Sequence, residues 1–108
     1  MKTYHGKRGR DGVKVRVVDE LDQTGYKLKP RNDLRNHSPD GFEYGYGGSG
    51  PAQLALALLA DVFDDYTALN FYQQFKREEI ATLDQREDFT LTEVEIKKWL
   101  AAELAVRH

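Results

Sequence analysis

The stretch Ala52-Gln53-Leu54-Ala55-Leu56-Ala57-Leu58-Leu59-Ala60 decides the fold, because it is apolar at nearly every position. A helix of this composition has no polar face to present to water, so it is covered on several sides and belongs at the centre of the core. Ser49 is a suitable N-cap, and Pro51 fits the first turn, where its missing N–H does no harm. The pattern predicts a buried helix that begins at Ser49-Gly50-Pro51.

Upstream of this helix, the stretch Val13-Lys14-Val15-Arg16-Val17-Val18 alternates apolar and charged residues, which is the period of a strand with one buried face. Shorter strands are predicted on either side of it at Tyr4-His5-Gly6 and Tyr26-Lys27-Leu28. The Gly and Asp residues that tight turns need lie between the strands, in residues 9–12 and 22–25. Residues 1–29 are therefore expected to form a three-stranded antiparallel meander.

Two further helices are expected downstream. The second begins at Asp64-Asp65 and carries apolar residues at helical spacing, namely Ala68, Phe71, Tyr72 and Phe75. The third begins with the capping box Thr92-Glu93-Val94-Glu95, and Leu91 before it can pack on Ile96 as a hydrophobic staple. The predicted fold class is α+β, with the meander, a long ordered loop and three helices packed on the sheet.

A chain of 108 residues has room for one hydrophobic core, so residues 1–108 are expected to form a single domain. It divides into the meander at 1–29, a Gly-rich loop at 30–50 and a helical part at 51–108. The loop shows neither the helical nor the strand period, and loops of this length in compact domains are usually either functional or disordered. Its aromatic residues favour order, so we expect any site to lie there.

The chain has no cysteine, which excludes disulfides, thiolate catalysis and cysteine-bound zinc or iron–sulfur clusters. Its histidines, His5, His37 and His108, are scattered without a spaced carboxylate partner, so no metal site is expected. No apolar run approaches the roughly 20 residues that span a bilayer, and the N-terminus lacks the apolar region of a signal peptide. We therefore expect a cytoplasmic protein without a membrane partner.

The net charge is −2, whereas dedicated nucleic-acid binders are usually basic. The charges are unevenly distributed, however, because acidic residues gather from Asp61 onward. The first third carries most of the basic residues, namely Lys7, Arg8, Arg10, Lys14, Arg16, Lys27, Lys29, Arg31 and Arg35. Two interpretations stay open: solvated charges on strands and turns, or a basic face that binds nucleic acid.

The segment Gly45-Tyr46-Gly47-Gly48-Ser49-Gly50 matches the G-x-G-x-x-G pattern of dinucleotide-binding loops. A dinucleotide site also needs a parallel strand after the helix, and here another helix is expected instead. Pro51 stands where a P-loop needs lysine and where a hydrolase elbow needs glycine. We expect no cofactor, and the glycines either allow close packing or help to bind a small anionic or planar ligand at the helix N-terminus.

Residues 32–40 hold the densest run of polar side chains. His37 has the chemistry of a general base, with Asp33 or Asp40 to orient it and Arg35 to stabilise charge. The same residue types are ordinary turn formers that hydrogen-bond to their own backbone. A catalytic loop and a purely structural loop are both compatible with this composition.

The run LRNHSPDGFEYGYGGSGPAQLALALL, residues 34–59, resembles a family of short uncharacterised prokaryotic and viral proteins that consist of a domain of unknown function. The resemblance extends over nearly the whole chain through Tyr4-His5-Gly6, residues 72–76, Leu91-Thr92-Glu93, Ile96 and Trp99. Tyr44 stands where many relatives carry Trp. The resemblance implies a small stand-alone domain, sometimes encoded on mobile elements, and it implies no reaction, ligand or catalytic residue.

Our leading hypothesis is a small non-enzymatic intracellular binding or accessory protein that acts on a host macromolecule through the Arg35–Ser49 loop. Its candidate ligand- or partner-binding residues are Arg35, Asn36, His37, Tyr44, Tyr46, Gly47, Gly48 and Ser49. The expected partner is a protein or a small anionic ligand, and the chain is expected to be a monomer or a homodimer.

Two alternatives remain. The first is a small enzyme or binder for a phosphate- or nucleotide-like ligand at the Gly-rich loop, with His37 and Arg35 as catalytic residues if it is an enzyme. The second is nucleic-acid binding through the basic N-terminal third.

Overall fold

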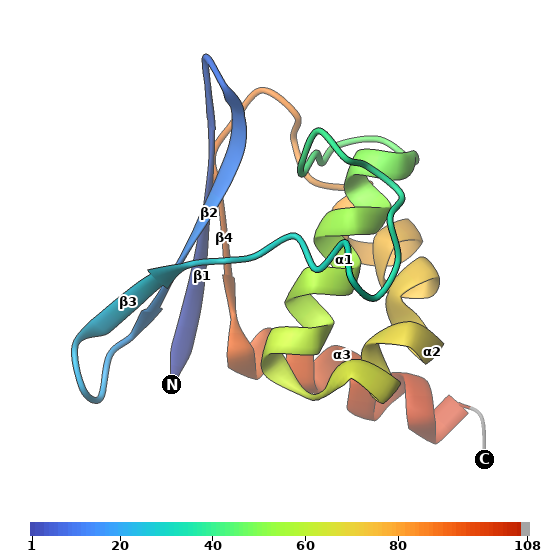
Figure 1. Cartoon of the computed structure of the whole chain (residues 1–108). Coiled ribbons are helices and arrows are strands. Elements are labelled where there is room, and N and C mark those ends of the chain that lie inside the picture. The colour runs from blue at the N-terminus through green and yellow to red at the C-terminus, as the bar shows by residue number, and fades with distance from the viewer. Residues whose placement is uncertain (107–108) are drawn as a thin grey trace.

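The computed structural model describes residues 1–106, and these form a four-stranded antiparallel sheet with helices on one of its faces (Figure 1). The elements are β1 (Lys2–Gly9), β2 (Gly12–Asp19), β3 (Thr24–Lys27), α1 (Ser49–Val62), α2 (Asp65–Phe75), the π-helical turn η1 (Lys76–Ile80), β4 (Phe89–Thr92) and α3 (Glu93–Val106). The strand order is β3-β2-β1-β4. The predicted α+β class is confirmed.

The three-stranded meander is incomplete as a prediction, because β4 adds a fourth strand beside β1. β4 has only four residues, Phe89-Thr90-Leu91-Thr92, and although they alternate apolar and polar, four is the shortest run over which this period can be read. Its last residue, Thr92, is also the N-cap of α3, so the helix signal masks the strand. Its partner, residues 3–6 of β1, lies at the other end of the chain.

A glycine in β1 makes room for β4. Gly6 lies directly opposite Phe89, and a Cβ on Gly6 would stand 1.9 Å from the Phe89 ring. Phe89 in turn packs edge-on against Tyr44, with 4.9 Å between the ring centroids. Any side chain at position 6 would therefore displace the ring that joins β4 to the loop before α1.

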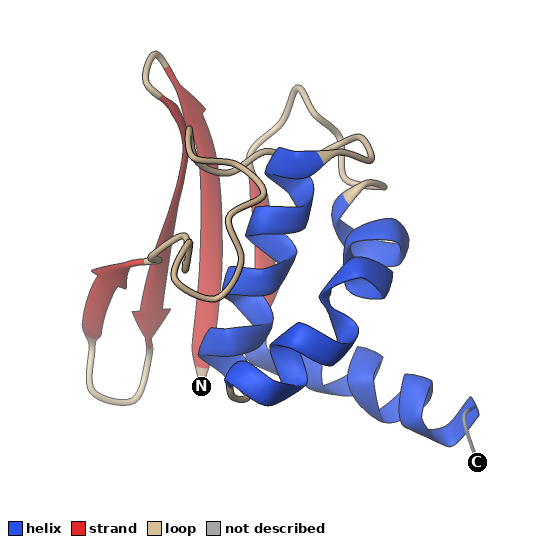
Figure 2. Ribbon diagram, turned by 45° about the vertical axis from the view of Figure 1, so that its right-hand side comes forward, coloured by secondary structure: helices blue, strands red, loops and turns tan. Residues whose placement is uncertain are grey.

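α1 forms the centre of the core, as its composition predicts. Every residue of the stretch 50–59 is buried, and α1 lies between the sheet and α2 in both views (Figures 1 and 2). The expectation that all three helices pack on the sheet is wrong for α2, which packs on α1 on the side away from the strands. An apolar helix with no polar face accounts for this layering, because a sheet alone covers only one side of it.

The start of α1 differs from the prediction. Gly48, rather than Ser49, is the N-cap, and no side chain caps the first turn. The ring of Tyr46 occupies the space beside Gly48, where a Cβ would stand 2.8 Å from it. The position before the helix therefore favours a residue without a side chain over a hydroxyl cap.

The other two predicted helix starts are confirmed. The Asp64 carboxylate accepts a hydrogen bond from the Thr67 N–H at 2.7 Å at the start of α2. In the capping box of α3, the Thr92 hydroxyl accepts from the Glu95 N–H and the Glu95 carboxylate accepts from the Thr92 N–H, both at 3.1 Å. Leu91 and Ile96, the residues of the expected staple, are both buried.

Within residues 1–106, no helix combines the length and the apolar character that a membrane crossing requires.

We expect Gly6→Ala to lower the free energy of unfolding by about 1–3 kcal/mol, because the added methyl group overlaps the Phe89 ring. Urea denaturation followed by circular dichroism measures this change. Gly9→Ala in the same strand is the matched control, since a Cβ there comes no closer than 3.9 Å to a neighbour. Equal midpoints for the two variants would contradict this account of β4.

Candidate functional site

The first half of the long loop between β3 and α1 is bound at four points by one side chain, Gln53, which is completely buried. Its Oε1 accepts hydrogen bonds from the backbone N–H groups of His37, at 2.9 Å, and Ser38, at 3.2 Å. Its Nε2 donates to the carbonyl oxygens of Pro30, at 2.5 Å, and Arg35, at 3.0 Å. One amide thus satisfies four backbone groups of a segment that has no regular structure of its own.

His37 packs against α2. Its Nε2 lies 2.6 Å from the hydroxyl oxygen of Tyr72, and the two ring centroids are 5.4 Å apart. Among the described residues no carboxylate contacts the imidazole. Asp33, one of its expected partners, is bound by Arg31 at 3.0 Å instead, and this hydrogen bond lowers the pKa of the Asp33 carboxyl.

Arg35 is exposed, and among the described residues its guanidinium donates only to the neighbouring carbonyl of Leu34. Asn36 is also exposed, and its side chain accepts from that of Asn32 at 3.0 Å. The predicted catalytic residues Arg35 and His37 are therefore close in sequence but lie in different environments. Arg35 is in solvent, and His37 packs against Tyr72.

The glycine-rich half of the loop is partly core. Tyr44 is completely buried, donates to the carbonyl of Glu87 at 2.7 Å, and has the Arg8 guanidinium 4.9 Å from its ring centroid. Gly45 has a φ of +89°, and a Cβ there would lie 2.5 Å from Gln85. Tyr46 is 43% exposed. Of the other expected site residues, Gly47 and Ser49 are exposed or half-buried at the surface, and Gly48 lies beside the Tyr46 ring.

Sequence reasoning missed a cluster around Asp61, in the last turn of α1. The carboxylate accepts hydrogen bonds from the hydroxyls of Tyr4, at 2.6 Å, and Tyr26, at 2.7 Å, and lies 3.5 Å from the Lys2 ammonium. Burial, and then the hydrogen bond to Asp61, raises the pKa of both tyrosines, so they stay protonated as donors. The cluster joins β1 and β3 to α1 across 35 to 59 residues of chain, which no local pattern could indicate.

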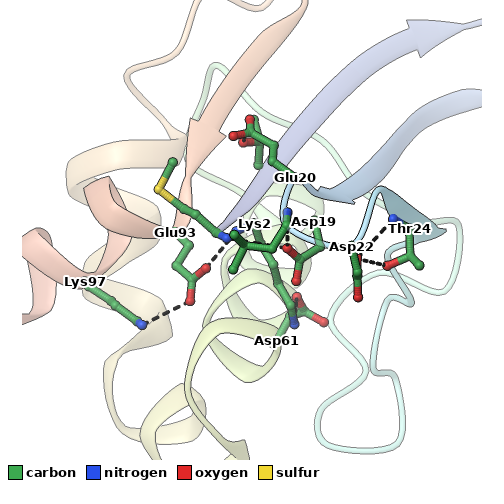
Figure 3. A network of polar contacts seen from close by, with 11 residues as sticks. Lys2, Asp19, Glu20, Asp22, Thr24, Asp61, Glu93 and Lys97 are labelled. Atoms are coloured by element: carbon green, nitrogen blue, oxygen red, sulfur yellow. Dashed lines mark hydrogen bonds and ion pairs between the residues drawn. The ribbon is translucent and has the colours of Figure 1, made fainter.

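The Asp61 cluster continues into α3 through Lys2. The Lys2 backbone N–H donates to the Glu93 carboxylate at 2.7 Å, and Glu93 pairs with Lys97 at 3.0 Å (Figure 3). The backbone hydrogen bond from Lys2 is the main cause that lowers the pKa of Glu93. The first residues of β1 are thus fastened to both flanking helices.

A cleft opens beside Asp61, between the end of β3 and α1, with a volume of about 420 Å³. Its lining residues are Tyr26, Lys27, Leu28, Lys29, Arg31, Ala57, Ala60 and Asp61, and we call it the β3–α1 cleft. Leu28 and Ala57 are buried, whereas Lys27 and Lys29 are exposed. Neither lysine forms an ion pair with a residue that the structure describes.

The face of the sheet turned away from the helices is basic. His5, Arg16 and Lys27 stand side by side on β1, β2 and β3, and Lys7 stands opposite Lys14 in a second row. All five are exposed, because the alternation of each strand turns the valines inward and these residues outward. We call this set the basic face; within residues 1–106 none of its cations has an acidic partner.

The β1–β2 turn extends the basic face. Arg10 lies in the turn, and together with Lys7 and Lys14 it lines a hollow of about 170 Å³ that also includes Asp11. Basic side chains around a small hollow suit a single phosphate group.

Residues 4–102 match the family model described as a family of unknown function (DUF6166). The chain belongs to this family. The match spans from β1 into α3, so it includes nearly the whole sheet, all of α1 and α2, and most of α3. No curated protein and no solved structure matches the chain significantly.

Among residues 1–106, no three His, Asp or Glu side chains come together as a metal-binding group would. His108, one of the histidines considered above, lies outside the described residues.

We expect Gln53→Leu to lower the free energy of unfolding by about 3 kcal/mol or more, because buried backbone groups of the loop lose the amide that pairs with them. Hydrogen exchange at the His37 and Ser38 amides should accelerate together with the loss of stability. The control is Gln73→Leu, which removes a half-exposed glutamine from α2. Unchanged exchange at these two amides would show that Gln53 does not hold the loop.

Proposed function

We propose that the protein is a non-enzymatic binding protein whose ligand is a nucleic acid, held by its phosphates on the basic face. The observation that carries this proposal is a group of exposed cations without acidic partners in a chain whose net charge is −2. We place this activity in the cytoplasm, which suits a cysteine-free chain.

The arrangement of charge favours an anionic ligand. Lys7 faces Lys14, and Arg16 faces Lys27, so like charges stand directly opposite one another on neighbouring strands. Such pairs repel each other in the unbound protein. A ligand that carries a row of phosphates relieves this repulsion and releases its own counterions on binding.

Three basic residues outside the basic face provide a contrast. Lys2 pairs with Asp61, Arg8 with Glu43, and Arg31 with Asp33 and Asp65, whereas no described acidic residue pairs with the cations of the basic face. The outward-facing positions of β1, β2 and β3 carry no acidic residue. Asp11 and Glu20 lie in the turns that follow β1 and β2.

The basic face also indicates how a nucleic acid would be held. Sheets that read bases stack them on aromatic side chains. The outward-facing neighbours of the cations in the described part of the chain are Thr3, Val18, Gly25 and Thr90, and none is aromatic. Binding on this face would therefore be to phosphates and independent of sequence.

We expect the double variant Lys14→Gln/Arg16→Gln to weaken nucleic-acid binding and to reduce the slope of log K against log salt by about 2, one for each phosphate that the variant no longer binds. Fluorescence anisotropy with a labelled oligonucleotide, titrated at several salt concentrations, measures both quantities. The matched control is Arg77→Gln/Lys98→Gln, which changes the net charge equally on the helical side. Equal effects in the two variants, or no binding by the wild type at low salt, would refute the proposal.

A second candidate function is the binding of a partner protein by the rim of the loop. Tyr46 is 43% exposed and Arg35 is in solvent, although Gln53 orders the loop that carries them. Ordered loops on a rigid frame commonly carry recognition.

If the loop rim binds a partner, Arg35→Ala and Tyr46→Ala should each keep the wild-type melting temperature and lose the partner in an affinity pull-down from the native host. Neither side chain is buried, so stability should not change. Capture of the same proteins by both variants and by the wild type would remove this candidate.

A further inference from the structure

The β3–α1 cleft has the size and lining of a ligand site. Its volume of about 420 Å³ falls within the range of small-molecule sites, about 300–1,000 Å³. Its floor is apolar, because Leu28 and Ala57 are buried and Ala60 adds a methyl group beside them. Such a floor receives a flat, weakly polar group.

Tyr26 gives the cleft an aromatic wall in a fixed position. Its side chain is 39% exposed, while its hydroxyl lies 2.7 Å from both oxygens of the Asp61 carboxylate. The ring therefore needs no ordering when a ligand arrives. Stacking on a pre-oriented aromatic ring is the sequence-tolerant way in which proteins hold bases.

The cleft is lined by one carboxylate and by three cationic side chains. Asp61 also lines the cleft, but its carboxylate already accepts hydrogen bonds from Tyr4 and Tyr26 and pairs with Lys2, so its role there is to hold the Tyr26 ring in place. Lys27 and Lys29 supply cations that no described acidic residue neutralises. Arg31 is not available in the same way, because Asp33 and Asp65 both bind its guanidinium at 3.0 Å.

We propose that the β3–α1 cleft holds one nucleotide unit, with the base on the apolar floor against Tyr26 and the phosphate at Lys27 and Lys29. This inference rests on the proposed function, because Lys27 lines the cleft while its side chain points to the basic face, so the phosphate would lie at the rim where the two meet. A base reaches the cleft only when it is unpaired and unstacked, so single strands bind more tightly than duplexes.

The first experiment fills the cleft. Ala60→Leu adds a larger side chain to the half-exposed position on its floor, and Ala101→Leu makes the same change at an exposed position of α3. Fluorescence anisotropy compares a labelled mixed-sequence single-stranded DNA with its duplex. We expect Ala60→Leu to weaken single-strand binding about tenfold, the effect of losing one stacked base, and to leave duplex binding and the control unchanged.

The second experiment separates a strand from a free nucleotide. Adenosine monophosphate is titrated into the wild type, and the methyl signals of Leu28, Ala57 and Ala60 are followed by nuclear magnetic resonance. Shifts at these methyl groups together with the single-strand effect assign the cleft to a nucleotide within a strand. Shifts without binding of either DNA assign it to a free nucleotide and overturn the proposed function of the basic face.

A third set of results would overturn the inference about the cleft and leave the proposed function of the basic face intact. Ala60→Leu would bind the single strand as tightly as the wild type does, and adenosine monophosphate would shift none of the three methyl signals. Lys14→Gln/Arg16→Gln would still weaken binding of both DNAs. In that case nucleic acid binds the basic face only, and the cleft holds no base.

Discussion

One buried amide holds the irregular part of this protein. The segment between β3 and α1 lies against the core with backbone polar groups out of reach of water, and each such group needs a partner. Gln53 supplies partners for four of them from inside an otherwise apolar helix. The position of His37 against Tyr72 depends on this order, because Gln53 binds the His37 backbone N–H.

This arrangement changes where function is to be sought. The polar density of residues 32–40 indicates chemistry when it is read along the chain, yet several of these groups bond within the loop or to Gln53 instead of converging on one point. The sheet shows the reverse pattern. Its inner face is valine and aromatic, and its outer face gathers cations from β1, β2 and β3 that have no described partners.

The sequence predicts those features that a local pattern can encode. Neighbouring residues are enough to predict three elements: α1 from its apolar run, β2 from its alternation and the start of α3 from its capping box. β4, the Asp61 cluster and the β3–α1 cleft all depend on residues far apart in the chain. Gln53 is the instructive case, because a single polar residue in an apolar run carries no periodic signal. The basic N-terminal third is visible in the sequence, but only strand register shows that its side chains share one face.

The position of β1 has a consequence for synthesis of the chain. β1 is made before the strands that flank it, yet it lies inside the sheet and pairs on one side with β4, so that His5 meets Thr90 across 85 residues. Until residues 89–92 leave the ribosome, that side of β1 presents unpaired N–H and C=O groups, a template for pairing with another chain. In the folded sheet the edge on this side is the four-residue β4 instead, and a product cut short before Phe89 would keep the longer edge of β1 exposed.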